Sequence, residues 1–328
     1  IEIDELFRDL ESSHPLAIEK IHCSLDSKAY TLYTSGSTGR PKGISITHRV
    51  IASRIICDQF PLKENEVIVS KTSFSFVDFL WELFLPLVKG HQCQIVPTDA
   101  CRDPLRLISY LSSPNTKRIV LVPSLLAVII ELAEEDIEKL IHIEYWFSTG
   151  EPLQASLAFR FYAKLPNAKL YNLYGSSEVW DISIWPVPKD ISQNSPIFSG
   201  KPLPNTSVFI LDEEYGLLPP GVIGNITVAG DHLLSEYSGT KRDDSEGITT
   251  IDIGGRNHKV WNSGDKGYWD KSGNLMLVGR ADNLVKIRGF RVDLNEIESV
   301  AKQSESVKDV VASQTSSGYI AMSVLVDS

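Results

Sequence analysis

Short apolar runs alternate with amphipathic stretches between residues 29 and 173, and this alternation restricts the fold more than any other feature. The strand-like runs are residues 29–33, 94–96, 119–123, 145–147 and 168–173. Helical spacing follows Thr47 and recurs over residues 79–87, 124–140 and 153–165. Such a βαβα order predicts an α/β fold with a largely parallel sheet and helices on its faces.

The character of the chain changes near residue 199. Short β-rich pieces over residues 207–212, 224–228 and 274–278 are separated by Pro and Gly, which predicts a small β-rich subdomain. Beyond residue 282, helical spacing over 294–302 is followed by strands over 307–313 and 320–326. We therefore expect three parts: an α/β portion (1–198), a β-rich subdomain (199–281) and the start of an α+β subdomain (282–328).

Composition excludes several function classes. The 32 basic residues are scattered among 42 acidic ones, giving a net charge of −10, so we expect no nucleic-acid partner. The longest apolar stretches fall short of the ~20 residues that span a bilayer, and residues 1–10 lack the pattern of a signal peptide. Four cysteines without CxxC spacing indicate neither zinc nor a disulfide framework. We expect a cytoplasmic protein with no membrane partner.

The strongest chemical signal is YTSGSTGRPKG at residues 33–43, between an apolar strand and a helix expected to start near Thr47. Glycines allow close backbone approach, hydroxyls and N–H groups offer donors, and Lys42 supplies a cation, so the segment suits a polyphosphate. It lacks the GxxxxGK spacing of the common NTPase loop. The alternative is a flexible Ser/Gly connector.

Two more polar clusters follow. NLYGSSE at residues 172–178 ends a strand of the α/β part, where ligands bind in open sheets, and it offers an aromatic ring and a carboxylate. SGDKGY at 263–268, GRAD at 279–282 and KIRGFR at 286–291 combine an acid with several cations, which suit ribose and phosphate. Taken singly, each cluster is more often a turn or a salt-bridged surface.

As a set, these motifs resemble the adenylate-forming superfamily, and specifically the amino-acid adenylation domains of nonribosomal peptide synthetases. The resemblance runs from about residue 29 to the end of the chain. It adds SFVDFLWELFLPLVKG as the substrate helix and STGEP as an adenine segment, and extends the later motifs through NSGDKGYWDKSGNLMLVGRADNLVKIRGFRVDLNEIE.

The resemblance implies a two-step reaction. A carboxylate attacks the α-phosphate of ATP to give an acyl-adenylate and pyrophosphate, and the phosphopantetheine thiol of a carrier protein then takes the acyl group. Loop, cations and Mg²⁺ would act by positioning and charge neutralisation. The implied partners are an amino acid, a peptidyl carrier protein and the rest of a multidomain synthetase.

The resemblance also assigns roles to residues. The β- and γ-phosphates fall to Thr34, Ser35, Gly36, Ser37, Thr38, Gly39 and Lys42. The adenine side comprises Gly150, Glu151, Pro152, Asn172, Tyr174, Gly175, Ser176 and Ser177, with Tyr174 stacking on the base. Glu178 would bind Mg²⁺. Asp265 and Arg280 would bind the ribose, with Leu277 nearby, and Asp282 would be the hinge. Thr34, Lys42, Glu178, Asp265 and Arg280 are the expected catalytic residues.

The substrate helix departs from the family pattern. Activators of α-amino acids carry Asp where this chain has Val77, and the carboxylate here is Asp78. One helical residue turns a side chain by about 100° and advances it ~1.5 Å, which suits an amine one carbon further from the carboxylate. The other expected pocket residues are Trp81, Val120, Phe147, Thr149, Leu173, Asp181 and Ile182. The hypothesis is a β-amino acid, β-alanine first; alternatively Asp78 caps the helix or faces solvent and another amino acid binds.

The motif positions also differ from the family pattern at both ends. The phosphate loop lies unusually early, and the sequence ends before the PxxxxGK segment with the catalytic lysine. We therefore expect a fragment of a larger synthetase that adenylates poorly alone and exposes a sheet edge and an apolar face. Two other functions remain open. One is an acyl- or aryl-acid:CoA ligase, whose acid substrate offers no cation to Asp78, and the other is a catalytically silent nucleotide-binding fragment.

Overall fold

The computed structural model describes residues 23–34, 42–56, 59–132, 136–230, 233, 236–238, 248–304, 306–315 and 319–326. Its centre is a five-stranded sheet in the order β5-β6-β7-β8-β9. The strands are β5 (Arg118–Leu121), β6 (Tyr145–Ser148), β7 (Lys169–Ser176), β8 (Trp180–Pro186) and β9 (Lys201–Pro202). β5, β6 and β7 are parallel, whereas β8 and β9 are antiparallel to their neighbours. The expectation of a largely parallel sheet therefore holds only for its first three strands.

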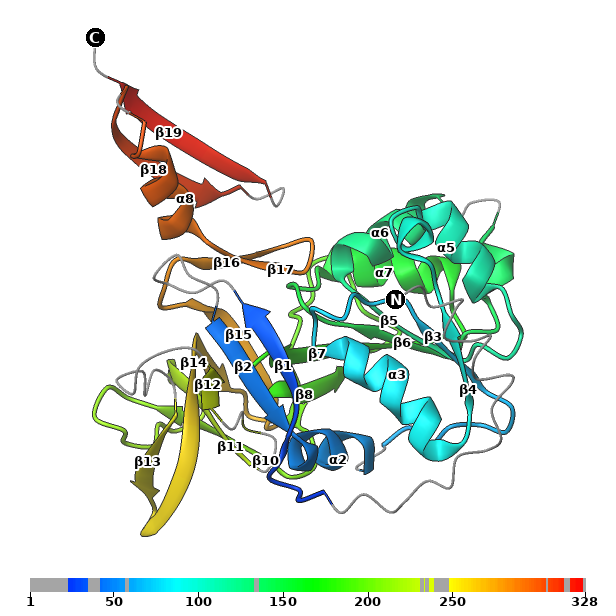
Figure 1. Cartoon of the computed structure of the whole chain (residues 1–328), viewed down its shortest axis with the longest axis horizontal. Helices are drawn as coiled ribbons and strands as arrows, with labels where there is room; N and C mark the ends of the chain where they lie inside the picture. The colour runs from blue at the N-terminus through cyan, green and yellow to red at the C-terminus, as the bar shows by residue number, and fades with distance from the viewer. Residues whose placement is uncertain are drawn as a thin grey trace.

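Helices cover this sheet on one face, as Figure 1 shows for α5, α6 and α7. They are α5 (Pro104–Leu111), α6 (Pro123–Leu132) and α7 (Ala155–Lys164), with a 3₁₀ turn η1 at Ile137–Leu140. Their apolar faces and the strands bury one continuous core that includes Leu107, Ile129, Trp146 and Phe161. The strand–helix alternation of the sequence is thus realised as β5-α6-β6-α7-β7.

A second parallel pair, β3 (Val67–Ser70) with β4 (Gln92–Ile95), is joined by α3 (Asp78–Lys89), and α4 (Thr98–Cys101) follows. Asp78 in the first turn of α3 lies at the positive end of the helix dipole. Gly90 ends the helix in the left-handed conformation at φ 72°, which glycine adopts without strain. These two residues fix the substrate helix predicted from the sequence.

The glycine-rich segment joins two antiparallel strands. β1 (Lys28–Thr34) pairs with β2 (Lys42–Thr47), which also pairs with β12 (Glu236–Ser238), and α2 (His48–Ile56) begins directly after β2. The helix start near Thr47 is correct, but a strand separates it from the loop, because residues 42–47 continue the pairing with β1. Residues 35–41 lie outside the described part of the chain.

The β-rich part forms an antiparallel sheet in the order β10-β11-β14-β13, with β15 also paired to β14. Its strands are β10 (Thr206–Leu211), β11 (Gly224–Gly230), β13 (Ile248–Ile253), β14 (Arg256–Trp269) and β15 (Leu275–Arg280). The β9 strand lies beyond the expected boundary at residue 198 but pairs with β8. The division into three parts stays a prediction.

The end of the chain forms two further hairpins, of which the second projects from the rest together with α8 in Figure 1. β16 (Leu284–Ile287) pairs with β17 (Phe290–Asp293), α8 (Leu294–Ala301) follows, and β18 (Val307–Gln314) pairs with β19 (Ile320–Val326). Arg288 and Gly289 both have positive φ, as a two-residue hairpin turn requires.

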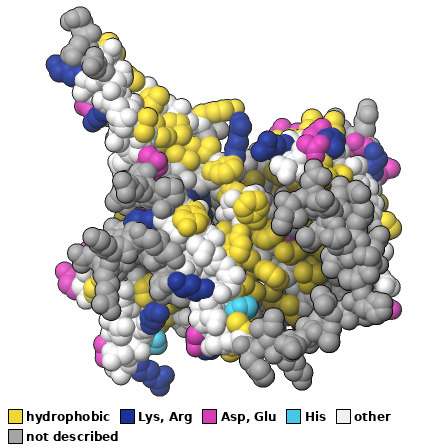
Figure 2. Space-filling view, viewed as in Figure 1, with side chains coloured by type: hydrophobic (Ala, Val, Ile, Leu, Met, Phe, Trp, Pro, Cys, Tyr) yellow, Lys and Arg dark blue, Asp and Glu magenta, His cyan; other side chains and the backbone are white. Residues whose placement is uncertain are grey.

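Apolar side chains gather over the middle of the face seen in Figure 2. Large hydrophobic residues are exposed at several places, among them Phe74, Leu87, Val88, Ile95 and Met322. An exposed apolar face was expected from the sequence. Among the described helices, no run is sufficiently long and apolar to cross a bilayer.

Candidate active site

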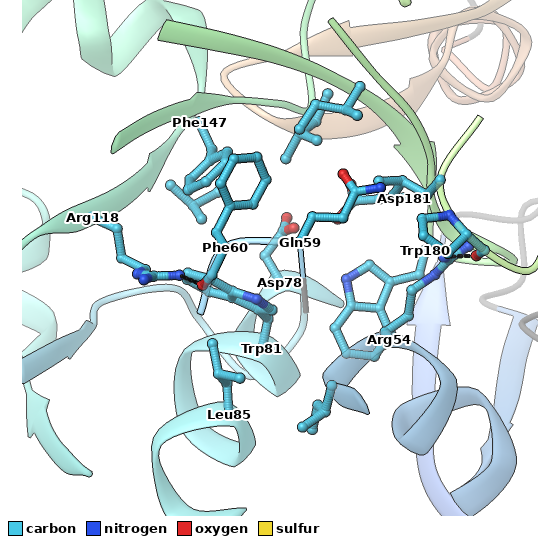
Figure 3. Close-up of a pocket in the computed structure, with 16 residues that line it drawn as sticks. Arg54, Gln59, Phe60, Asp78, Trp81, Leu85, Arg118, Phe147, Trp180 and Asp181 are labelled. Atoms are coloured by element: carbon cyan, nitrogen blue, oxygen red, sulfur yellow. Dashed lines mark hydrogen bonds between the residues drawn. The ribbon is translucent and has the colours of Figure 1, made fainter. Parts of the chain in front are cut away.

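A cavity lies between α2, α3 and the sheet strands β5 to β8 (Figure 3). It encloses about 730 Å³ of empty space, part of which is open to solvent. Its lining is mainly apolar, with four charged side chains. The residues are Arg54, Ile55, Gln59, Phe60, Asp78, Trp81, Leu85, Arg118, Val120, Phe147, Leu173, Trp180, Asp181, Ile184, Leu203 and Pro204.

Most of the predicted substrate residues meet at this cavity. Those that line it are Asp78, Trp81, Val120, Phe147, Leu173 and Asp181. Val77, Thr149 and Ile182 are buried next to it but do not line it. Val77 instead joins the apolar cluster formed by the β1–β2 hairpin, α3 and β8. The displaced carboxylate Asp78 therefore faces the cavity, whereas the side chain before it fills the core.

The start of α3, which carries Asp78, is held against the preceding loop by Glu82, one turn further along the helix. Glu82 is 1% exposed and accepts hydrogen bonds from the backbone N–H groups of Lys71 (2.9 Å) and Thr72 (2.7 Å), and from the Thr72 hydroxyl (2.8 Å). A buried carboxylate with three donors holds the preceding loop tightly against the helix. The start of α3 is consequently a rigid part of the cavity wall.

Two acids face this cavity from different elements, Asp78 from α3 and Asp181 from β8 (Figure 3). Burial raises the pKa of Asp78 to about 6, and the negative charge of Glu82 adds to the rise. Burial also raises the pKa of Asp181 to about 7, with a further contribution from the charge of Asp78. The positive charge of Lys286 acts against both rises, and Arg54 acts against that of Asp181. The apolar setting thus disfavours the charged forms of both acids, and a ligand with a cation would favour them.

A tight turn places Asp181. The strands β7 and β8 approach so closely that a Cβ on Gly175 would lie 2.1 Å from the carbonyl oxygen of Trp180. Trp180 itself has φ 57°, a left-handed conformation that is strained for a bulky residue. Such strain persists only where the surrounding structure enforces it. The turn therefore orients Asp181 toward the cavity.

The aromatic side of the cavity contains a residue that the sequence reasoning missed, Phe60. Its ring packs edge-on against Phe147, with 5.1 Å between ring centroids, and against Tyr171 at 4.9 Å. Arg54, Gln59 and Arg118 were missed in the same way. Gln59 and Phe60 precede a strand without any chemical motif, so nothing in the sequence marked them.

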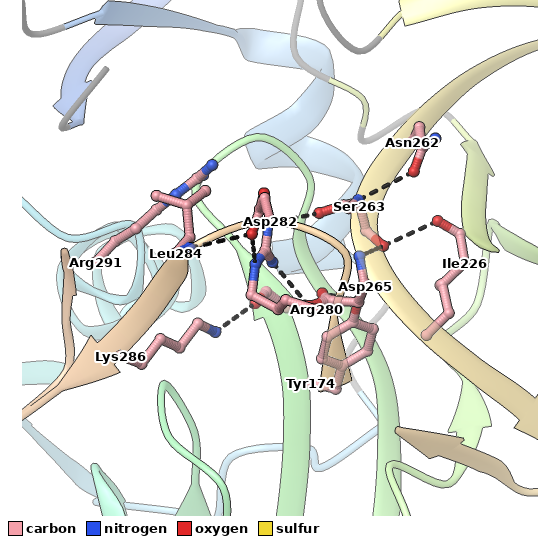
Figure 4. Close-up of polar contacts among 12 residues, drawn as sticks. Tyr174, Ile226, Asn262, Ser263, Asp265, Arg280, Asp282, Leu284, Lys286 and Arg291 are labelled. Carbon is pink, nitrogen blue, oxygen red and sulfur yellow. Dashed lines mark hydrogen bonds and ion pairs between the residues drawn. The ribbon is translucent and has the colours of Figure 1, made fainter. Parts of the chain in front are cut away.

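The predicted ribose residues form one hydrogen-bonded network (Figure 4). Tyr174 Oη donates to Asp265 Oδ2 at 2.5 Å, and Arg280 Nη1 donates to Asp265 Oδ1 at 2.7 Å. Arg280 also binds Asp282 through Nε (2.7 Å) and Nη2 (2.8 Å). Burial and the neighbouring Asp265 charge raise the pKa of Tyr174 well above its usual value. Since each carboxylate oxygen has two lone pairs, Asp265 keeps acceptor capacity for ribose hydroxyls.

The β16–β17 hairpin contacts the site at three points. Lys286 Nζ donates to the Gly175 carbonyl at 3.2 Å, and Arg291 Nη1 pairs with Glu178 Oε1 at 2.7 Å. At the hairpin turn, the Gly289 N–H donates to Glu151 Oε1 at 2.7 Å. Burial lowers the pKa of Lys286, which agrees with its place between the hairpin and the sheet.

Glu178 is the residue assigned to Mg²⁺, and its surroundings fit that ion. Its side chain is 4% exposed, and its Oε2 atom is buried without a hydrogen-bond partner in the described structure. The described residues contain no cluster of three or more His, Cys, Asp or Glu that could hold a metal. Mg²⁺ commonly uses only one or two carboxylates together with substrate phosphates, so a single orphaned carboxylate oxygen suits it.

Several of the remaining predicted nucleotide residues have defined contacts of their own. Glu151 accepts from the N–H (2.9 Å) and hydroxyl (3.1 Å) of Ser124, and Asn172 Nδ2 donates to the Phe198 carbonyl at 2.8 Å. Thr34 and Lys42 face each other across the β1–β2 pair. The others described are Gly150, Pro152, Ser176, Ser177 and Leu277. Ser35, Gly36, Ser37, Thr38 and Gly39 fall outside the described residues.

Comparison with known proteins identifies the fold. The family model of the AMP-binding enzyme matches residues 4–238. The chain belongs to the AMP-binding enzyme family. Tyrocidine synthase 3 of Brevibacillus parabrevis is 34% identical over 293 residues, which is 87% of this chain. The β-alanyl-bioamine nonribosomal peptide synthetase ebony of Drosophila melanogaster is 33% identical over 329 residues, which is 96% of this chain. The predicted resemblance to adenylation domains is thereby confirmed.

Solved structures agree with the predicted fold class. The holo form of PA1221, a nonribosomal peptide synthetase protein with adenylation and PCP domains bound to a vinylsulfonamide inhibitor, superposes with a TM-score of 0.82 over 95% of this chain at 24% identity. The AMP-binding chain spans 55% of that structure, 4% of tyrocidine synthase 3 and 37% of ebony. The acyl-adenylate-forming fold is confirmed.

Proposed function

We propose that this sequence forms the ATP- and amino-acid-binding part of an amino-acid adenylating ligase of nonribosomal peptide synthesis. Its substrate is a β-amino acid, β-alanine first. The observation that carries this proposal is the acidic pair Asp78 and Asp181 in an apolar cavity of an AMP-binding chain. Half-buried carboxylates in an apolar cavity are stabilised by a bound ammonium group and gain nothing from an aryl or fatty acid.

The reaction proposed is the transfer of an adenylyl group. An oxygen of the amino-acid carboxylate attacks the α-phosphorus of ATP, an acyl–phosphate bond forms, and the bond to pyrophosphate breaks. The thiol of a carrier-protein phosphopantetheine then attacks the acyl carbon as its thiolate, and AMP leaves. Asp78 holds the ammonium group, which keeps the carboxylate at a fixed distance from the nucleotide.

The nucleotide would lie along the residues named above. Asp265 and Arg280 would take the ribose, and Tyr174 the base. Glu178 would hold Mg²⁺ together with the phosphates, and that ion supplies neutralisation of phosphate charge. Thr34 and Lys42, at the two ends of the glycine-rich loop, would bind the terminal phosphates.

The position of the acid supports a β-amino acid. Asp78 faces the cavity while Val77, the position of the usual acid, does not line it. The amine of the substrate must therefore reach a carboxylate one residue further along α3. The name of the relative ebony, a β-alanyl-bioamine synthetase, agrees with this interpretation at 33% identity.

Calorimetric titration of the chain with non-hydrolysable adenylate analogues tests the proposal. Analogues that carry β-alanyl, L-alanyl and benzoyl groups should bind in that order of affinity. Preference for L-alanyl would retain the family function and refute the β-amino acid, and preference for benzoyl would favour an acid:CoA ligase. No binding by any of them would refute the proposed function.

A matched pair of variants locates the amine site. Asp78→Asn keeps the side-chain size and removes the charge, so it should abolish β-alanyl binding and leave benzoyl binding nearly unchanged. Asp190→Asn makes the same change at an exposed surface acid and should alter neither. Equal loss with both analogues in Asp78→Asn would indicate damage to the fold and not a lost ammonium partner.

A further inference from the structure

We propose that Phe60 is a specificity-determining residue that closes the aromatic side of the substrate cavity, and that Arg118 and Glu66 hold it there. This inference rests on the proposed function, because it concerns the acyl group that the same cavity accepts. Phe60 lies outside every motif of the sequence, in the connection between α2 and β3.

The ring of Phe60 is part of an aromatic wall of the cavity. It packs edge-on against Phe147 (5.1 Å between centroids), Tyr171 (4.9 Å) and Tyr145 (5.5 Å). Phe147 in turn contacts Trp81 at 6.1 Å. Phe60, Phe147 and Trp81 line the cavity, whereas Tyr145 and Tyr171 do not. The ring of Phe60 therefore lies between the cavity and these two tyrosines.

Arg118 fixes the backbone that carries this ring. Its Nη1 donates to the Phe60 carbonyl at 2.6 Å and its Nη2 to the Pro61 carbonyl at 3.1 Å. The same guanidinium makes two bonds to Glu66, Nε to Oε1 at 2.5 Å and Nη2 to Oε2 at 3.1 Å. Both charged side chains are 0% exposed.

These hydrogen bonds hold the irregular segment that contains Phe60 and Pro61 in one conformation. A fully buried ion pair is costly to form, because both charges lose their contact with water. Here the guanidinium satisfies the Glu66 carboxylate and two carbonyls at once, which only a planar fork with several donors can do. The segment from Gln59 to Pro61 is consequently held against the sheet although it belongs to neither helix nor strand.

The position of the ring limits the substrate. Phe60 lines the same cavity as the acidic pair, so a substituent on a β-alanyl chain bound there would meet its ring. Removing the ring vacates the space that it fills against Tyr145, Phe147 and Tyr171. A phenyl-bearing β-amino acid would fill that space.

The test compares two analogues in calorimetric titrations, β-alanyl adenylate and 3-amino-3-phenylpropanoyl adenylate, both non-hydrolysable. The wild-type chain should prefer β-alanyl. Phe60→Ala should raise the ratio of phenyl to β-alanyl affinity by about tenfold or more, within the range known for filling or vacating apolar pockets, and Phe60→Leu should give an intermediate ratio.

Two further variants separate specificity from stability. Phe209→Ala removes a partly buried ring that packs on His258, away from the cavity, and should leave the ratio unchanged. Arg118→Lys keeps the charge beside Glu66 but loses the fork, so it should shift the ratio in the same direction as Phe60→Ala. A merely structural role for Arg118 would weaken both analogues equally and leave the ratio as in the wild type.

The outcomes are distinguishable. An unchanged affinity ratio in Phe60→Ala and Phe60→Leu would refute the role given to Phe60 while leaving the proposed function intact. A wild-type chain that already prefers the phenyl analogue would do the same. A wild-type chain that binds neither analogue would overturn the proposed function and this inference with it. A shifted affinity ratio in the Phe60 variants, with an unchanged ratio in Phe209→Ala, would support Phe60 as the residue that limits the acyl group.

Discussion

Binding of an ammonium-bearing ligand should release a proton from the acidic pair. The pKa of Asp78 is raised to about 6 and that of Asp181 to about 7, first of all by burial and then by neighbouring negative charge. An ammonium group between them favours their charged forms and lowers both pKa values. Protons held by the free chain must then leave when the ligand enters.

The magnitude follows from these two pKa values. At pH 6.5 a group with pKa about 6 is protonated in about a quarter of the molecules and a group with pKa about 7 in about three quarters, so the pair holds about one proton. At pH 8 the same sum falls to about 0.1. The total belongs to the pair and does not depend on which carboxylate holds the proton.

Calorimetry in two buffers measures this number directly. At a fixed pH, the observed binding enthalpy changes with the ionisation enthalpy of the buffer, and the slope gives the protons released. The β-alanyl analogue should release about one proton at pH 6.5 and almost none at pH 8, and its affinity should rise between pH 6 and 7. A propanoyl analogue without the amine should release none.

Asp181→Asn provides the control, since it removes the titrating group of the pair with the higher pKa, about 7. Release at pH 6.5 should then fall well below one proton. Equal release by the amine-free analogue, or no release by the β-alanyl analogue at pH 6.5, would refute the idea that an ammonium group neutralises this pair.

Three other changes test the packing around the site. Arg118→Met should lower the free energy of unfolding by about 3–5 kcal/mol, measured by denaturant titration, because the 0% exposed Glu66 would be left as an unpaired buried charge. Gly175→Ala should reduce the soluble yield and abolish analogue binding, because its Cβ would lie 2.1 Å from the Trp180 carbonyl oxygen. Arg291→Ala removes an ion pair to a buried acid, so hydrogen exchange of the β16–β17 hairpin should become faster; unchanged exchange would contradict the role given to that contact.

The parallel part of the fold could be predicted because apolar periodicity is a local property. Runs of buried residues at 119–123 and 145–147 became β5 and β6 with helices between them. The reversal at β8 could not be predicted in the same way. It depends on the close approach of Gly175 to Trp180 and on the left-handed backbone of Trp180, which are properties of a turn in its three-dimensional surroundings.

In the candidate site, too, some residues could be predicted from the sequence and others could not. Asp78 was found because the segment around it resembles the substrate helix of adenylation domains, and the structure brings it to the cavity. Phe60 was not found because its role depends on Arg118, which follows it by 58 residues, and on rings from two other strands. Contacts between distant segments leave no pattern in a single sequence.

The hairpin contacts connect the two halves of the site. Glu151, Glu178 and the Gly175 carbonyl all belong to segments assigned to the nucleotide, and each accepts a hydrogen bond from β16–β17. A Cβ on Gly289 would lie 3.0 Å from Val122, so the turn of the hairpin approaches the end of β5 as closely as a glycine allows. A nucleotide bound as proposed would therefore draw on the same acceptors as the hairpin, and a change in either would alter the hydrogen bonds open to the other.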